Sequence, residues 1–182
     1  MAAQLPPESP PQDASDPKLY NAFFYGTLMA PKVLNRVCYG YNPSQNPRYA
    51  TATITSAPAI LHNFRRHRVK HADYPAILPA SGATVRGLYV TGLTEDDIFR
   101  LDAFEGEEYG RYAVKVKVLK EVGNEGSGEG NVEGEEVEAD TYVWEAGEGQ
   151  LERREWDFEE FKREKMRFWT GEGGQQEFAG EL

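Results

Sequence analysis

The stretch YAVKVKVLK at residues 112–120 alternates apolar and basic side chains, with Val114, Val116 and Val118 separated by lysines. This period of two is typical of a half-buried β-strand. A second strand-like stretch, VEADTYVW at 137–144, follows after a Gly/Glu-rich run. The two stretches predict a β-hairpin with a lengthened turn, which costs little because loop-closure entropy grows only logarithmically with loop length.

The rest of the chain predicts more strands than helices. Further strands are expected at residues 20–26, 49–60, 65–69 and 85–91. Helices are expected over residues 31–38, over residues 95–105 and from Asp157 onward. Because the strands are short, interrupted by glycine and more numerous than the helices, the sequence predicts an α+β domain built on a small, mostly antiparallel sheet or barrel.

Two of the predicted helices carry clear N-terminal signals. Thr94 has Asp97 three positions later, which is close to a capping box. Asp157 is a favourable N-cap residue for the last helix. Trp156 precedes it and can pack against Phe161 as a hydrophobic staple, so this helix is expected to pack on the body of the domain.

A chain of 182 residues is long enough for one domain and short for two. Prolines are concentrated near the start of the chain, so residues 1–18 are expected to form a flexible tail. Residues 170–182 have a similar composition and are expected to be flexible too. The folded domain is therefore predicted to span residues 19–169, with a flexible Gly/Glu-rich loop at residues 122–136.

Composition also restricts where the protein works. No stretch reaches the roughly 20 apolar residues that a membrane helix needs, and the N-terminal residues lack the features of a secretory signal. The single cysteine, Cys38, cannot form an internal disulfide, which fits a reducing compartment, and we expect it to be a small buried side chain. These features predict a cytoplasmic protein that has no membrane partner.

The net charge of −10 is concentrated in one segment of the chain. Seven glutamates and no basic residue lie between Glu121 and Glu138, which leaves −3 on the remainder. One hypothesis is that this acidic segment recruits a basic partner, and the simpler one is a solvated loop. The basic stretch at residues 62–79 is short and has no second basic stripe beside it, so nucleic acid is not an expected partner.

The segment FFYGTLMAPKVL at residues 23–34 joins a predicted strand to a predicted helix through Gly26. The backbone N–H groups of such a turn are unpaired and can bind an anion. The hydroxyl of Thr27 could assist, and glycine allows a ligand to approach the backbone closely. An ordinary core strand followed by a turn is the alternative interpretation.

Glu105 lies at the end of the helix predicted over residues 95–105. Helical spacing puts it on the same face as Ile98 and Leu101, so the carboxylate is expected to point inward. Burial, the negative end of the helix dipole and neighbouring acids should raise its pKa, which makes it a better general base. A structural ion pair with Arg111 is the alternative.

Other catalytic chemistries find little support in the sequence. His67 and His71 would share a helix face and could bind a metal ion, but Tyr74 before Pro75 and the strand-like flanks argue against a helix. His71 or Tyr74 could instead border a pocket. Cys38 has no nearby histidine, and no glycine-rich nucleotide-binding motif is present. Neither a metal ion nor another cofactor is expected.

Several motifs follow one another along the chain in an informative order. They are FFYGTLM at 23–29, DYPAILP at 73–79, VRGLYV at 85–90, LDAFEGEEYGRYAVKV at 101–116 and ADTYVW at 139–144. Together they resemble the γ-glutamylcyclotransferase-like family, and within it the group with plant avirulence-induced proteins and γ-glutamylamine cyclotransferases. The segment WDFEEFKREKMRFW at 156–169 is similar to the C-terminal helix of fungal and plant members.

The resemblance implies a small mixed, mostly antiparallel β-barrel with flanking helices and a pocket that holds a γ-glutamyl group. It implies that Glu105, in the LDAFEG motif, is the catalytic base. The substrate-binding residues that it implies are Tyr25, Gly26, Thr27, Leu28 and Tyr142.

The implied reaction is intramolecular. The α-amine of the substrate attacks its own γ-carbonyl, which forms 5-oxoproline and releases a free amine without an enzyme nucleophile, a metal ion or another cofactor. The expected partner is therefore a small γ-glutamyl amine or γ-glutamyl amino acid, and the protein is expected to be a monomer or a weak homodimer. The alternative is a non-catalytic member that keeps the pocket as a ligand-binding or interaction module.

Overall fold

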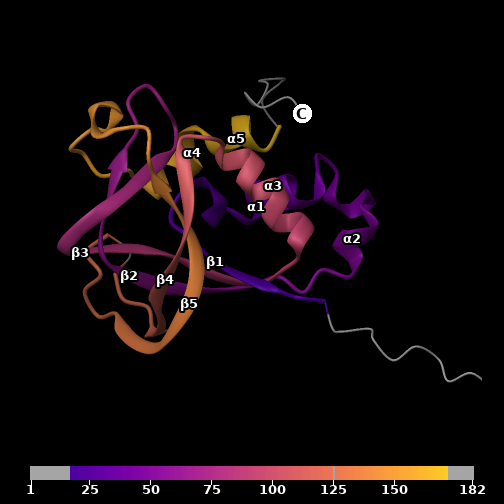
Figure 1. The fold of residues 1–182 in the computed structure, drawn as a ribbon, viewed down its shortest axis with the longest axis horizontal. Coiled ribbons are helices and arrows are strands. Elements are labelled where there is room, and N and C mark those ends of the chain that lie inside the picture. The colour runs from indigo at the N-terminus through magenta and orange to yellow at the C-terminus, as the bar shows by residue number, and fades with distance from the viewer. Residues whose placement is uncertain (1–16, 125, 172–182) are drawn as a thin grey trace, which may run out of the picture.

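A closed β-barrel forms the centre of the computed structural model, which describes residues 17–124 and 126–171 (Figure 1). The strands follow one another around the barrel in the order β1-β3-β2-β4-β5. The described pairings are antiparallel except that of β1 with β5. This confirms the predicted α+β class and the mostly antiparallel barrel. The strands are β1 (Tyr20–Phe24), β2 (Thr55–Arg68), β3 (Pro75–Leu93), β4 (Tyr109–Glu121) and β5 (Val132–Trp144).

The two predicted tails fall almost entirely outside the described residues. Only residues 17–18 of the first segment and 170–171 of the second are described, so the extents of both tails stay predictions. Within the described part of the chain, no helix has the length and apolar character needed to cross a membrane.

Strands β2 and β3 form a hairpin that is longer than the sequence predicts. The strand expected from residue 49 begins only at Thr55, because Pro47–Ala50 form the short helix α2. The ladder between the two strands runs from Thr55 opposite Thr91 to Arg68 opposite Pro75, with a register shift on the way. The middle of β3, at residues 80–84, is small or polar and contains Gly82, so pairing with β2 on either side of this stretch, rather than its own apolar pattern, keeps it in one strand.

Strands β4 and β5 confirm the predicted hairpin, but its loop is shorter than the expected 122–136. β5 already begins at Val132, so the last acidic residues of the predicted loop belong to a strand. The Glu136 carboxylate lies 3.6 Å from the ammonium group of Lys115 and 3.4 Å from that of Lys117. Such cross-strand charge pairs extend the hairpin into a stretch whose composition alone predicts a loop.

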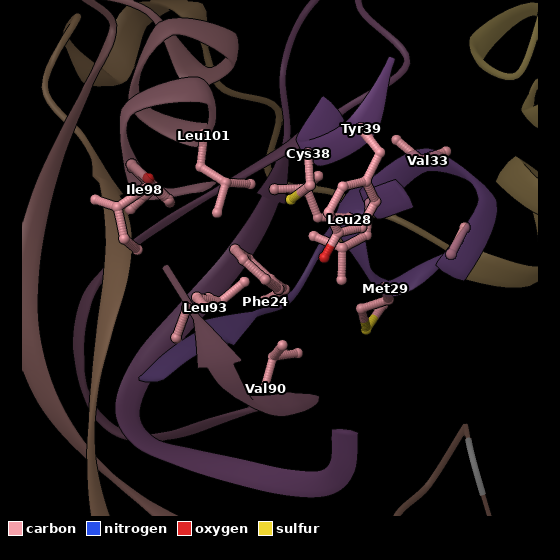
Figure 2. Packing of buried hydrophobic residues seen from close by; sticks show 14 of the residues in the cluster. Phe24, Leu28, Met29, Val33, Cys38, Tyr39, Val90, Leu93, Ile98 and Leu101 are labelled. Atoms are coloured by element: carbon pink, nitrogen blue, oxygen red, sulfur yellow. The ribbon is translucent and has the colours of Figure 1, made fainter. Parts of the chain in front are cut away.

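Helices α1 (Pro31–Tyr39) and α3 (Glu95–Glu105) pack beside each other on one flank of the barrel (Figure 1). Their inward side chains join those of β1 and β3 in one apolar cluster (Figure 2). Cys38 is fully buried in this cluster, as predicted. The cluster fixes the helix pair on the barrel, and its members include Phe24, Leu93, Ile98 and Leu101.

The N-terminus of α3 is fixed by the predicted capping box. The Thr94 hydroxyl accepts a hydrogen bond from the Asp97 N–H (3.3 Å), and the Asp97 carboxylate accepts one from the Thr94 N–H (2.9 Å). Asp97 is only 1% exposed and also accepts a hydrogen bond from the Arg48 guanidinium. Arg48 donates in addition to the Cys38 carbonyl (3.3 Å), so the start of α3 is tied to α1.

The predicted C-terminal helix forms in two pieces, α4 (Phe158–Glu164) and α5 (Met166–Trp169). Asp157 caps α4, because its carboxylate accepts hydrogen bonds from two N–H groups of the first turn (2.8 and 3.1 Å). The rings of Trp156 and Phe161 have centroids 5.6 Å apart, which confirms the predicted staple. The two pieces meet at Lys165, which ends α4 and precedes α5.

Replacing Asp97 by Ala should lower the free energy of unfolding by about 3 kcal/mol, since it removes a helix cap and the buried partner of Arg48. Urea denaturation followed by circular dichroism measures the loss. Asp96→Ala is the matched control, because that carboxylate is 76% exposed and 3.9 Å from Arg48, and its loss should stay below about 1 kcal/mol. Equal losses would show that the buried network does not hold α3.

Candidate active site

A cavity of about 660 Å³ lies where distant parts of the chain converge. Its wall combines the turn after β1, the first residue of β3, the C-terminal end of α3, the start of β4 and the end of α5. Figure 1 shows α5 next to the C-terminal end of α3. This volume is in the range of cavities that bind small molecules.

The turn after β1 carries most of the predicted binding residues. Thr27 begins a single 3-10 turn, which is closed by a hydrogen bond from the Met29 N–H to the Gly26 carbonyl (2.9 Å). The first N–H groups of such a turn have no partner inside it and remain available to an anionic ligand. The structure places all four predicted residues of the turn in the cavity wall, namely Tyr25, Gly26, Thr27 and Leu28.

Glycine at position 26 lets the turn approach β3 closely. A Cβ atom at Gly26 would lie 2.8 and 2.9 Å from ring carbons of Pro75, which is closer than real Cβ atoms come to other atoms. Pro75 also lines the cavity, and its carbonyl accepts a hydrogen bond from the Tyr109 hydroxyl (2.9 Å). The missing side chain therefore brings two parts of the wall together.

Tyr142, the remaining predicted binding residue, lines the same cavity from β5. The Tyr25 hydroxyl donates to the Tyr142 carbonyl (2.6 Å), and the Tyr142 hydroxyl donates to the Asp102 carboxylate (2.8 Å). Burial is the largest cause that raises the pKa of both phenols, and the nearby Glu105 carboxylate raises it further. Both hydroxyl groups therefore keep their protons at neutral pH.

Glu105, the predicted base, is the last residue of α3 and lines the cavity half-buried. Burial, assisted by the Asp102 carboxylate, raises the pKa of Glu105 from its ordinary value of 4.5 to about 8. The alternative ion pair with Arg111 is not observed, because Arg111 binds Asp102 (2.9 Å) and Asp140 (2.8 Å) instead. Within residues 17–124 and 126–171, Glu105 has no cationic side chain in ion-pair range.

The structure also places in the wall residues to which the sequence assigned no role. Tyr74, which the sequence allowed as a pocket residue, lines the cavity, whereas His71 is exposed and lies outside the lining. For the remaining lining residues, the sequence offered only their membership of the family-like motifs, which does not say which way a side chain points. These additional residues include Glu108, Tyr109, Phe168 and Trp169.

Other chemistries receive no support from the described part of the chain. It contains no cluster of three or more His, Cys, Asp or Glu side chains that could hold a metal ion. His67 lies in β2 and not on a helix, and its ring Nδ1 is 3.0 Å from the Glu152 carbonyl oxygen. Burial, as the main cause, raises the pKa of the Cys38 thiol to about 12, so this side chain is not a nucleophile.

Sequence comparisons identify relatives along most of the chain. Residues 22–161 match the family described as gamma-glutamyl cyclotransferase, AIG2-like. AIG2-like protein D of Arabidopsis thaliana is 33% identical over 152 residues, which cover 81% of this chain and 82% of that protein. AIG2-like protein B of the same plant is 32% identical over 158 residues, which cover 85% of this chain and 76% of that protein.

Solved structures share the fold. The solution structure of the Arabidopsis thaliana protein At5g39720.1 has a TM-score of 0.55 at 30% identity and covers 82% of this chain and 84% of that chain. The crystal structure of an AIG2-like protein from Mus musculus has a TM-score of 0.50 at 18% identity, covers 76% of this chain and 88% of that chain, and shows a likeness of fold alone. With the family match over residues 22–161, the chain belongs to the AIG2-like γ-glutamyl cyclotransferase family.

Proposed function

We propose that the protein is a γ-glutamyl cyclotransferase that converts a γ-glutamyl amine or a γ-glutamyl amino acid to 5-oxoproline and a free amine. Membership of the family supports cyclotransferase-type activity in general. The observation that carries the proposal is the half-buried Glu105 carboxylate. Among the described residues it has no cationic partner, and it lines the same cavity as the turn formed by Tyr25–Leu28.

In this proposal the two charged groups of the γ-glutamyl head are held by different parts of the wall. The α-carboxylate binds to N–H groups at the start of the 3-10 turn and to the Thr27 hydroxyl. The α-ammonium group pairs with Glu105, the carboxylate at the end of α3. Binding both groups orients the α-nitrogen toward the γ-carbonyl of the same molecule, which favours ring closure over other reactions.

The reaction itself is a transfer of two protons and an exchange of one C–N bond for another. Glu105 removes one proton from the α-ammonium group, and the resulting amine attacks the γ-carbonyl carbon. A five-membered ring closes, and the bond from the γ-carbon to the leaving nitrogen breaks. Glu105 returns its proton to the leaving nitrogen, which also receives the second proton lost by the attacking nitrogen. The products are 5-oxoproline with one N–H and the released amine as an ammonium ion.

The raised pKa of Glu105 suits this proton transfer. An ordinary carboxylate is a weak base toward an ammonium group, whereas Glu105 has a pKa of about 8, which is much closer to that of the substrate's α-ammonium group. A proton then moves in either direction between the two groups at small cost in free energy. The buried thiol of Cys38 takes no part, because the nucleophile belongs to the substrate.

Glu105→Gln should lower kcat/KM by at least about a hundredfold, because the amide keeps the shape of the side chain and cannot accept a proton. The assay measures 5-oxoproline released from γ-glutamyl amines, γ-glutamyl amino acids and glutathione. Glu107→Gln removes a charge from the exposed neighbour outside the cavity lining and should keep its activity. Folded wild-type protein that binds glutamate-like ligands but forms no product from any substrate would favour the non-catalytic module instead.

The Glu105→Gln variant should gain thermal stability relative to the wild type as the pH rises. The folded chain holds the Glu105 proton up to a pKa of about 8, whereas the unfolded chain releases it near 4.5. The folded state therefore binds more protons between these two values, and its stability falls as the pH increases through them. The difference in Tm between Glu105→Gln and the wild type should be larger at about pH 8.5 than at about pH 5. A constant difference would contradict the raised pKa.

The pH dependence of kcat/KM should show an acidic limb near pH 8, because Glu105 must be ionised in the free enzyme to accept a proton and its pKa is about 8. Below this limb, activity should fall by about tenfold per pH unit. The residual activity of Glu105→Gln should lack the limb. A wild-type profile that is flat between about pH 6 and about pH 9 would exclude Glu105 as the base.

A further inference from the structure

Some residues of the cavity wall take no part in the proposed proton transfer, and they form a continuous surface. The ring of Trp169 packs edge-on against Tyr74 and against Phe104, with centroids 6.2 and 5.9 Å apart. The Tyr74 hydroxyl donates to the Glu108 carboxylate (3.4 Å). All four side chains line the cavity and are half-buried. We call Tyr74, Phe104, Glu108 and Trp169 the aromatic–acidic wall.

Contacts with helices α1 and α4 hold Trp169 of the aromatic–acidic wall in place. The Arg36 guanidinium, from α1, donates to the Trp169 carbonyl (2.6 Å). The Phe161 ring, from α4, packs edge-on against the Trp169 ring with centroids 5.9 Å apart. These contacts attach α5 to two other helices, so its tryptophan is a fixed part of the cavity.

The lining of the cavity is acidic. Its described residues include Asp73, Glu105 and Glu108 but no lysine, arginine or histidine. Asp73 is already paired with Lys165 (3.5 Å), which lies outside the lining. Glu108 accepts a hydrogen bond from Tyr74, and within the described part of the chain no cation lies in ion-pair range of it. Once the α-ammonium group of a substrate pairs with Glu105, the Glu108 carboxylate still lacks a counterion.

We propose that the aromatic–acidic wall binds the leaving group and selects amines that carry a second, positive charge, as in the mono-γ-glutamyl derivative of a diamine. This inference rests on the proposed cyclotransferase function. When the turn and Glu105 hold the γ-glutamyl head, the aromatic–acidic wall is the part of the lining left for the rest of the substrate. Aromatic rings and a carboxylate together attract an ammonium group.

The same charge arrangement disfavours leaving groups that end in a carboxylate. γ-Glutamyl amino acids and glutathione carry such a group, and Glu108 would repel it in a lining without cationic side chains among its described residues. The aromatic–acidic wall therefore discriminates by the sign of the charge on the leaving group, while the turn and Glu105 recognise what all γ-glutamyl compounds share.

Three γ-glutamyl amides of equal chain length test the preference. They are the derivatives of diaminopentane, pentylamine and aminohexanoate, which differ in the charge at the far end of the chain. The kcat/KM of the diaminopentane derivative should exceed that of the pentylamine derivative by about tenfold, and that of the aminohexanoate derivative by about a hundredfold. Equal values would overturn the inference, while the 5-oxoproline formed would still support the cyclotransferase.

A pair of variants tests the role of Glu108. Glu108→Gln should reduce the ratio of kcat/KM between the diaminopentane and pentylamine derivatives by at least about fivefold. Glu107→Gln removes the same charge one residue away, at an exposed position outside the lining, and should keep the ratio. Equal ratios for the two variants would overturn the assignment of the preference to the aromatic–acidic wall.

A binding measurement separates failure of this inference from failure of the proposed function. Titration calorimetry with Glu105→Gln compares the binding of the diaminopentane and pentylamine derivatives while turnover is strongly reduced. Tighter binding of the cationic derivative, lost when Glu108→Gln is added, supports the charge preference of the aromatic–acidic wall independently of the rate of turnover. Equal binding of the two derivatives overturns it. Absence of 5-oxoproline from all three amides with the wild type would instead overturn the proposed function.

Discussion

The Glu105 carboxylate occupies its position because helix α3 is anchored along its length. At its start, Thr94 and the buried Asp97 form a capping box that Arg48 ties to the neighbouring helix. In its middle, apolar side chains such as Leu101 are buried between α1 and the barrel (Figure 2). A helix held at these points can present its last side chain to a cavity at a defined place, which a loop residue does less reliably.

An anchored carboxylate without a cationic partner destabilises the folded chain, since burial disfavours its charged form. Arg111, the partner that the sequence offered for Glu105, is engaged by Asp102 and Asp140 instead. Glu108, in the aromatic–acidic wall, also lacks a cationic partner. Its carboxylate accepts a hydrogen bond from the Tyr74 hydroxyl, and no cation lies in ion-pair range among the described residues. Groups of this kind are common at functional sites, where a ligand supplies the missing charge. The two acids would then recognise two different positive groups of one substrate.

The cavity depends on the complete barrel and on the helices that follow it. Its lining begins with the strand and turn near the start of the described chain and ends with Trp169 in α5. In its wall, a hydrogen bond joins Tyr25 and Tyr142, which are far apart in the sequence. Because elements from both ends of the domain meet there, the cavity wall is complete only when the barrel is closed and α5 is docked.

The sequence by itself determined the local features. The alternation at residues 112–120 predicted a hairpin, the spacing of Thr94 and Asp97 predicted a capping box, and helical periodicity placed Glu105 on an inward face. Only the tertiary structure decided that β5 reaches back to Val132 and which side chains share a wall with Glu105. The physical reason is the sequence separation of the interacting residues. Capping and helical periodicity involve residues only a few positions apart, whereas strand length and cavity lining depend on packing between segments distant in the chain.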